Sequence, residues 1–367
     1  MTTGTPWAEA GPVPQAGSKA VDLRKPAPSL FVKARPLATP EDVRNALQLA
    51  SELELATLPA YLQAVYSLDE RKNGMIVGMI TGVAMQEMAH FCTACNILVA
   101  IGGNPAIDDP KFIPTYPGGL PKDIGTQPGQ PEFIVHLLPF STQQVRDCFM
   151  IIEEPANPID IRDSARASLM SADIADNYRT IGEFYEAISA ALSADDFKEP
   201  RVNRQVTGIL DVPVIRTLAD ARAAIDRIIR EGEGTPSTPQ ESDGTMAHYY
   251  TFYEIFKGRK IVKKDDGWYF GDDLVPFDPT GVQDIIADPK QALYPEGSNA
   301  AIRSQAFNTY FSNLLKALHQ SFNGQPDRIN DSIGLMFDLK VQAKQLMLTP
   351  MPGQPGKFAA PTWEYVS

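Results

Sequence analysis

Glu87 and His90 are residue types that bind metal ions, and they stand three apart in an apolar part of the chain. Together with their apolar neighbours they follow steps of four and three residues, the spacing that places side chains on one face of an α-helix. This stripe consists of Ile76, Ile80, Val83, Glu87, His90, Ala94, Ile97 and Ile101. We therefore expect both polar side chains to lie in a core. An unpaired carboxylate is costly there, so it must be paired, neutralised or bound to a metal.

Glu54 follows the same kind of stripe nearer the amino terminus. Its apolar companions are Val43, Leu47, Ala50, Leu58, Tyr61 and Val65. Each of the two helices thus places one glutamate in the same core. A cation between the two carboxylates would relieve their repulsion. Carboxylates with imidazoles suit iron or manganese, whereas thiolates favour zinc or copper. A Glu-x-x-His pair facing single glutamates on neighbouring helices is how four-helix bundles build di-iron and di-manganese sites. The alternative is an ordinary salt bridge or a solvated helix face.

A third helix offers Glu183, which lies off its apolar stripe but near Thr180, Ala187 and Ala190. Glu183 therefore faces either a second buried surface or solvent. Periodicity alone does not choose between them.

The fourth helix offers Glu231 and Glu233, followed after an irregular stretch by His248. On a helical wheel Glu233 lies somewhat nearer the inner face than Glu231, but the neighbouring glycines leave the choice open. A histidine three residues after Glu233 is missing, because position 236 is a proline. His248 is the next candidate. It is either a ligand or a hydrogen-bonded residue of an aromatic helix.

Capping signals and periodicity place the elements that must position these residues. Thr39-Pro40-Glu41-Asp42 is a strong helix start, with a capping hydroxyl, a proline in the first turn and acids facing the helix dipole. We expect helices over 39–68, 75–101, within 160–197, 217–231, 246–256, 299–322 and 327–348. Residues 260–262 and 268–270 are expected to form a hairpin, and 103–159 and 232–245 to be irregular. Such long connections usually cover a site or bind a partner.

The expected fold class is therefore mainly α: a four-helix bundle with long irregular connections, a small β-hairpin and extra C-terminal helices. Residues 1–38 are rich in proline, glycine and alanine and are interpreted as an extended arm. Residues 39–257 form the bundle with the metal site. Residues 258–367 add the hairpin and helices packed on it, within one continuous domain.

The composition limits the partners and the compartment. The chain has 367 residues and a net charge of −12, which argues against nucleic acid and anionic membranes as partners. It has only three cysteines, which fits a reducing compartment. The start lacks a secretory pattern, and no apolar run approaches the roughly 20 residues of a spanning helix. We expect a cytoplasmic protein without a membrane partner, and a homo-oligomer remains open.

Several segments, taken in order along the chain, match a pattern known from one protein family. They are Glu54-Leu-Ala-Thr-Leu-Pro-Ala-Tyr61, Gln86-Glu-Met-Ala-His90, Ile101-Gly-Gly-Asn-Pro105, Thr180-Ile-Gly-Glu-Phe-Tyr185, Glu231-Gly-Glu-Gly234, His248-Tyr-Tyr-x-Phe252, Phe307-Asn-x-Tyr310, Phe322-Asn-Gly324 and Ala360-Pro-Thr-Trp-Glu-Tyr365. The combination resembles the ferritin-like family named after iminophenyl-pyruvate dimer synthase, over nearly the whole chain after residue 40.

The resemblance implies a ferritin-type bundle with a metal-binding carboxylate centre. Some members are parts of larger bacterial enzymes that oxidatively couple amino-acid-derived imines in indole-pigment and indolocarbazole biosynthesis. Carried over by position, the ligand set is Glu54, Glu87, His90, Glu183, Glu233 and His248.

The expected function is that of a di-metal oxidoreductase. It would use two transition-metal ions, iron first, with manganese or a mixed pair as alternatives. Its substrate would be a small, aromatic, amino-acid-derived molecule, with dioxygen or peroxide as co-substrate. The alternative is a protein of the same superfamily that binds or stores metal without turnover, although the long irregular segments argue against a storage cage.

Overall fold

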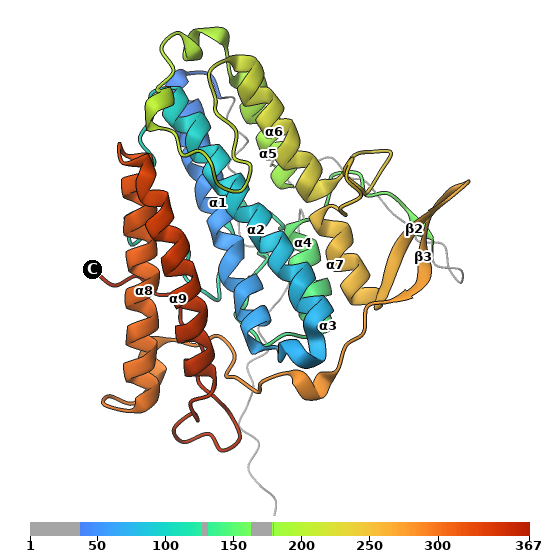
Figure 1. The fold of residues 1–367 in the computed structure, drawn as a ribbon, viewed down its shortest axis with the longest axis vertical. Helices are drawn as coiled ribbons and strands as arrows, with labels where there is room; N and C mark the ends of the chain where they lie inside the picture. Colours follow the sequence, from blue (N-terminus) through green and yellow to red (C-terminus); the bar gives the residue numbers. More distant parts are fainter. Residues whose placement is uncertain (1–36, 127–130, 163–177, 179) are drawn as a thin grey trace, which may run out of the picture.

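The structure, a computed structural model, describes residues 37–126, 131–162, 178 and 180–367. The predicted arm, residues 1–38, lies almost entirely outside the described residues. Among those that are described, helices dominate, as Figure 1 shows, so the expectation of a mainly α fold with a small hairpin is confirmed.

Two long helices form one half of a bundle. Helix α1 spans Pro40–Ser67 and begins with a capping box: Thr39 Oγ1 accepts the Asp42 N–H at 3.1 Å, and the Asp42 carboxylate accepts the Thr39 N–H at 2.9 Å. Helix α2 spans Glu70–Ala100 and bends at Asn73, where φ is −122° and ψ is 28°. The bend interrupts the apolar periodicity, which is why the pattern predicted a start near residue 75.

The other half of the bundle is built from shorter segments. Helices α6 (Leu218–Glu233) and α7 (His248–Lys257) follow one another along one side of the α1–α2 pair, with α5 (Ile181–Ala191) and α4 (Met150–Ile152) behind them in Figure 1. Thr217 caps α6 and Thr180 caps α5, each through a side-chain oxygen that accepts a backbone N–H.

The prediction that residues 103–159 are irregular is wrong in part. Helix α3 (Thr142–Gln144), a π-helical stretch (Val145–Phe149) and α4 join into one helical run. Val145, Phe149 and Ile152 bury its inner face, but the run lies amid proline- and glycine-rich sequence that hid it.

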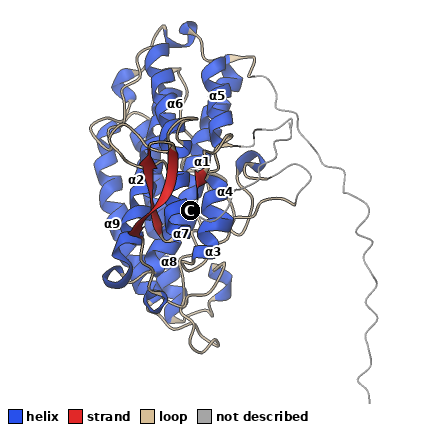
Figure 2. Cartoon of the chain, turned by 90° about the vertical axis from the view of Figure 1, so that its right-hand side faces the viewer, coloured by secondary structure: helices blue, strands red, loops and turns tan. Residues whose placement is uncertain are grey.

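The C-terminal third adds a hairpin and two helices. Strands β2 (Arg259–Lys264) and β3 (Gly267–Leu274) pair antiparallel, with Ile261 opposite Phe270. A short strand β1 (Ile161–Arg162), which was not predicted, pairs parallel with β3, giving the order β1-β3-β2. The sheet lies across α7 in Figure 2. Helix α9 (Ile329–Met347) packs against α1, and α8 (Asn299–Phe322) packs against α9.

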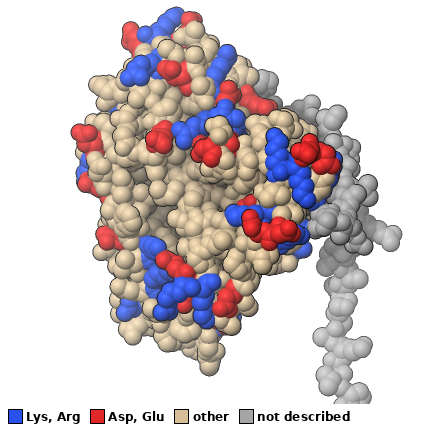
Figure 3. Space-filling model, turned by 45° about the vertical axis from the view of Figure 1, so that its right-hand side comes forward, with Lys and Arg blue, Asp and Glu red and all other residues tan. Residues whose placement is uncertain are grey.

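One hydrophobic core runs through the bundle and on to α8 and α9, and a smaller cluster lies under the sheet. Within the described part of the chain, α2 alone is long and apolar enough to cross a membrane by length and composition. Of its most apolar stretch, 61% is buried in the fold, as in the core helix of a bundle. On the face shown in Figure 3, basic and acidic side chains are interspersed.

Candidate metal centre

The interruptions in the second half of the bundle bring helix ends to its interior. Glu153 directly follows α4, Glu233 is the last residue of α6 and His248 is the first residue of α7. A helix end can present a side chain at an angle that a continuous helix does not offer. These ends face the stretch of α2 that carries Glu87 and His90.

Glu87 lies at the centre of the cluster, with one carboxylate oxygen toward each histidine. Its Oε1 lies 2.6 Å from His248 Nδ1, and its Oε2 lies 3.9 Å from His90 Nδ1. One donor atom from each of the three residues lies within 4.8 Å of the other two. The two imidazole rings are 5.4 Å apart between centroids. A carboxylate placed in this way can bridge two ions, each bound by one histidine.

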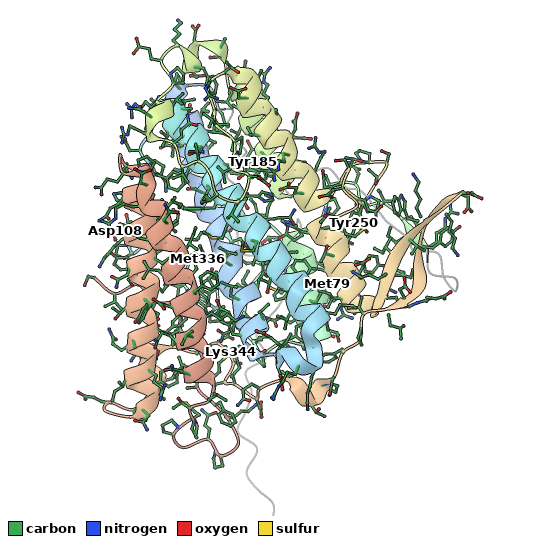
Figure 4. All side chains as sticks on the ribbon, in the orientation of Figure 1. Met79, Asp108, Tyr185, Tyr250, Met336 and Lys344 are labelled. Carbon is green, nitrogen blue, oxygen red and sulfur yellow. The ribbon has the colours of Figure 1, made fainter. Side chains whose placement is uncertain are left out.

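Two further carboxylates flank this centre in matching positions. Glu54 Oε2 lies 3.8 Å from His90 Nδ1, and Glu153 Oε2 lies 3.5 Å from His248 Nδ1. The other oxygen of each accepts a hydrogen bond from a fully buried tyrosine: Tyr185 donates to Glu54 at 2.6 Å and Tyr61 donates to Glu153 at 2.5 Å. Figure 4 shows Tyr185 within the bundle. The cluster therefore has two similar halves that share Glu87.

The outer nitrogens of both histidines have acceptors. His90 Nε2 donates to Glu231 Oε2 at 2.8 Å, and the other oxygen of Glu231 accepts from Arg227 Nε at 2.6 Å. His248 Nε2 donates to Gln86 Oε1 at 3.2 Å. In the tautomer with the proton on Nε2, the Nδ1 lone pair of each ring faces the carboxylates. Metal-binding histidines are held in this way, with the free ring N–H on a second acceptor.

His248 Nδ1 is the donor atom of the cluster that most clearly needs a proton or a cation beside it. The side chain is fully buried, and Nδ1 makes no hydrogen bond although Glu87 Oε1 is 2.6 Å away. A buried nitrogen lone pair beside a carboxylate oxygen is unfavourable unless a proton or a metal ion lies between them.

The surroundings of the cluster oppose the ionisation of its acids. Burial raises the pKa of Glu54 and of Glu87 well above the ordinary range of a carboxyl group, and the neighbouring carboxylates raise them further. In the described part of the chain, no lysine or arginine forms an ion pair with Glu54, Glu87 or Glu153. Divalent ions would supply the missing positive charge, and the donor set of carboxylates and imidazoles fits iron or manganese.

Glu231 and Glu233 have different places. Burial opposes the ionisation of Glu231, but the His90 ring and Arg227 lower its pKa to about 2, so it is an ionised partner of His90. Glu233 lines the central cavity together with Glu54, Glu87, His90 and Glu153. Burial raises the pKa of Glu233 to about 7, and its Oε1 accepts the Gly182 N–H at 2.7 Å. Of the two, Glu233 is therefore the one within reach of the cavity.

A model of the ferritin-like family matches residues 47–257, which include most of the bundle and every residue of this cluster. The chain belongs to the ferritin-like family. A curated relative, dichlorochromopyrrolate synthase from Lentzea aerocolonigenes, is 21% identical over 92% of this chain, which spans 37% of that protein. The crystal structure of a ferritin-like protein from Caulobacter vibrioides shares the fold, with a TM-score of 0.61 and 21% identity over 90% of this chain and 100% of that one.

The ferritin-like bundle does not bring all predicted ligands together. Glu54, Glu87, His90 and His248 meet, and Glu233 lines the same cavity. Glu183 does not line that cavity: it is partly exposed on the first turn of α5, where its N–H donates to Thr180 Oγ1. Because Tyr185 points inward, a residue two positions earlier lies about 200° away around the helix.

Glu153 lies in the cluster and was missed by the sequence analysis. It follows Val145 and Phe149 at steps of four, and both of those side chains are buried. That short stripe is the signal that could have found it, had the segment not been interpreted as irregular.

Proposed function

We propose that this chain is a non-haem di-metal oxidoreductase. Glu54 and His90 would hold one ion, Glu153 and His248 the other, and Glu87 would bridge them. The observation that carries the proposal is the buried Nδ1 of His248, which has no hydrogen bond and lies next to Glu87 and Glu153, two carboxylates without a lysine or arginine partner among the described residues. Glu233 is the further candidate ligand.

Iron is the first choice of metal, with manganese or a mixed pair as alternatives, because the donors are hard oxygens and imidazoles. When bound, such ions supply electron transfer and Lewis-acid chemistry with dioxygen or peroxide. The protein's own residues prepare the site. Tyr61 and Tyr185 orient the outer carboxylates through hydrogen bonds. The apolar wall of the cavity (Ile152, Ile181, Ile228 and Ile229) excludes bulk water.

The proposed substrate is a small, aromatic, amino-acid-derived molecule of secondary metabolism, handled in the cytoplasm without nucleic acid or membrane. Support comes from the sequence resemblance to the family of iminophenyl-pyruvate dimer synthase and from the similarity to dichlorochromopyrrolate synthase. This chain spans 37% of that relative, so the proposal extends to the class of substrate and not to that relative's whole reaction.

Metal analysis of the full chain tests the proposal. After anaerobic reconstitution with Fe(II) or Mn(II) and removal of loose metal, we expect two ions per chain in the wild type and none in Glu87→Ala. The matched control is Glu186→Ala, an exposed acid on α5, which should keep both ions. A wild-type protein without bound metal would refute the proposal.

Turnover is tested separately by mixing the Fe(II)-loaded protein with oxygen. An oxidised absorption band that an organic substrate discharges is the expected result. Iron that accumulates far beyond two per chain would instead identify a storage protein.

A further inference from the structure

The two histidines of the cluster differ in what holds their outer nitrogen. His90 donates to a carboxylate, Glu231, which Arg227 holds at 2.6 Å. His248 donates to the neutral amide oxygen of Gln86 at the longer distance of 3.2 Å. A hydrogen bond to an ionised acceptor is stronger than one to a neutral acceptor. It also raises the basicity of the metal-facing nitrogen.

In the residue types that surround each histidine, the two halves are closely matched. Each has a histidine facing Glu87 and an outer carboxylate. Each outer carboxylate accepts a hydrogen bond from a buried tyrosine, at 2.6 Å for Glu54 and 2.5 Å for Glu153. An unequal affinity of the two ion positions would therefore arise mainly from two features. These are the outer hydrogen bond of each histidine and the distances from its Nδ1 to the carboxylate oxygens.

The spacing of the donor atoms also differs between the halves. Donors bound to one ion at about 2.0–2.2 Å are about 3–4 Å from one another. Around His90 Nδ1, oxygens of Glu54 and Glu87 lie at 3.8 and 3.9 Å, within that range. Around His248 Nδ1, Glu87 Oε1 lies at 2.6 Å, so this contact must open before an ion can enter. A site that needs no rearrangement binds more tightly.

We propose that the two ion positions are inequivalent: the position at His90 and Glu54 fills first and more tightly, and the position at His248 and Glu153 fills second. This inference rests on the proposed di-metal function. Glu231 is then a positioning residue that acts through His90, and Gln86 is its weaker counterpart at His248. Unequal positions would let the chain load two different metals in a fixed order.

Titration of the metal-free full chain with Co(II), followed by calorimetry and visible absorption, tests the inference. We expect two ions per chain in two steps, the first at least about tenfold tighter. His248→Ala should keep the tight step and lose the weak one, whereas His90→Ala should lose the tight step.

Exchanging the outer acceptors tests the cause. Glu231→Gln keeps an acceptor for His90 without the charge, so it should weaken the first step about 10- to 100-fold and leave the second within about twofold. Gln86→Glu should tighten the second step and bring the two together. The control is Glu241→Gln, which removes a charge that pairs with Arg230 near the end of α6, and should change neither step.

The outcomes separate the two proposals. If the wild type binds no Co(II), the di-metal function itself fails. Two ions that bind with equal affinity, or a Glu231→Gln protein whose two steps both match the wild type, would overturn the inequivalence while leaving the di-metal function intact. Should Glu231→Gln fail to fold, His248→Ala and Gln86→Glu still test the inequivalence, because both change the ion position at His248.

Discussion

Tyr61, Tyr185 and the two histidines fix the orientation of the cluster's donor atoms through hydrogen bonds. The tyrosine hydroxyls donate to the far oxygens of Glu153 and Glu54, and the histidine Nε2–H groups donate outward. Glu54, Glu87, His90 and Glu153 line one small cavity, and His248 Nδ1 lies 2.6 Å from Glu87 Oε1. Such an arrangement would be costly in a core without a cation, which explains why these polar side chains share a buried face.

Glu153 and Glu183 provide a matched test of the ligand set. Glu153→Gln should lower the metal content from two ions to about one, because it removes a carboxylate that faces His248. Glu183→Gln should keep both ions, because its side chain lies outside the cavity lining. Metal content after reconstitution, with circular dichroism to verify folding, measures both. Loss of metal in Glu183→Gln alone would restore the assignment made from the sequence.

These two residues also show how far single-residue prediction reaches. Glu54, Glu87 and His90 were recognisable because they interrupt long apolar stripes, and burial is what a stripe predicts. Glu153 follows a short helical run amid proline- and glycine-rich sequence, where a stripe of three positions is too short to mark a helix. The choice between Glu231 and Glu233 depends on the end of α6. A helical wheel does not predict side-chain directions there, because glycines flank both residues.

At the scale of elements, the site depends on helices that stop in the interior. The end of α6 packs against the start of α5, so that the Glu233 carboxylate accepts the N–H of Gly182 in the first turn of α5. A carboxylate at a helix N-terminus is stabilised by the helix dipole. Gly182 leaves the space for this contact, because a Cβ there would lie 2.5 Å from Glu233 Oε1.

Gly182→Ala should therefore destabilise the protein, although alanine is a better helix former by about 1 kcal/mol. The new methyl group would displace the Glu233 carboxylate. The control is Gly78→Ala on α2, where no atom lies within 4 Å of the added Cβ, and which should stabilise by about 0.5–1 kcal/mol. Urea unfolding of both variants measures the difference. A stabilised Gly182→Ala protein would show that the Glu233 contact is not maintained in solution.

Elements with strong caps and long periods were predictable, and short ones were not. Thr39 caps α1 where the sequence indicated, and Thr217 caps α6 at the start of the helix predicted over 217–231. Strand β1 has only two residues, too few for any period, and it is recognisable only through its pairing with β3. Tertiary contacts, not local preference, create such elements.

At the scale of the whole molecule, the cluster couples the bundle's stability to its metal content. Four elements meet there through Glu54, Glu87, Glu153 and His248, and each carboxylate is buried. Without ions, crowding of these acids opposes folding. With ions, the same acids join α1, α2, the end of α4 and the start of α7. An ion that binds only the folded state at 100 times its dissociation constant adds about 2.7 kcal/mol.

Whether Glu87→Gln or the wild type is the more stable protein should depend on whether metal is present. In the presence of a chelator we expect it to be at least as stable as the wild type, because it removes a buried acid that faces two other carboxylates and has a raised pKa. With excess Mn(II), the wild type should unfold at a clearly higher temperature, and Glu87→Gln should change little. Thermal unfolding of both proteins under both conditions measures this. A wild type that is more stable than Glu87→Gln by the same margin with and without metal would mean that Glu87 serves only the packing of the bundle.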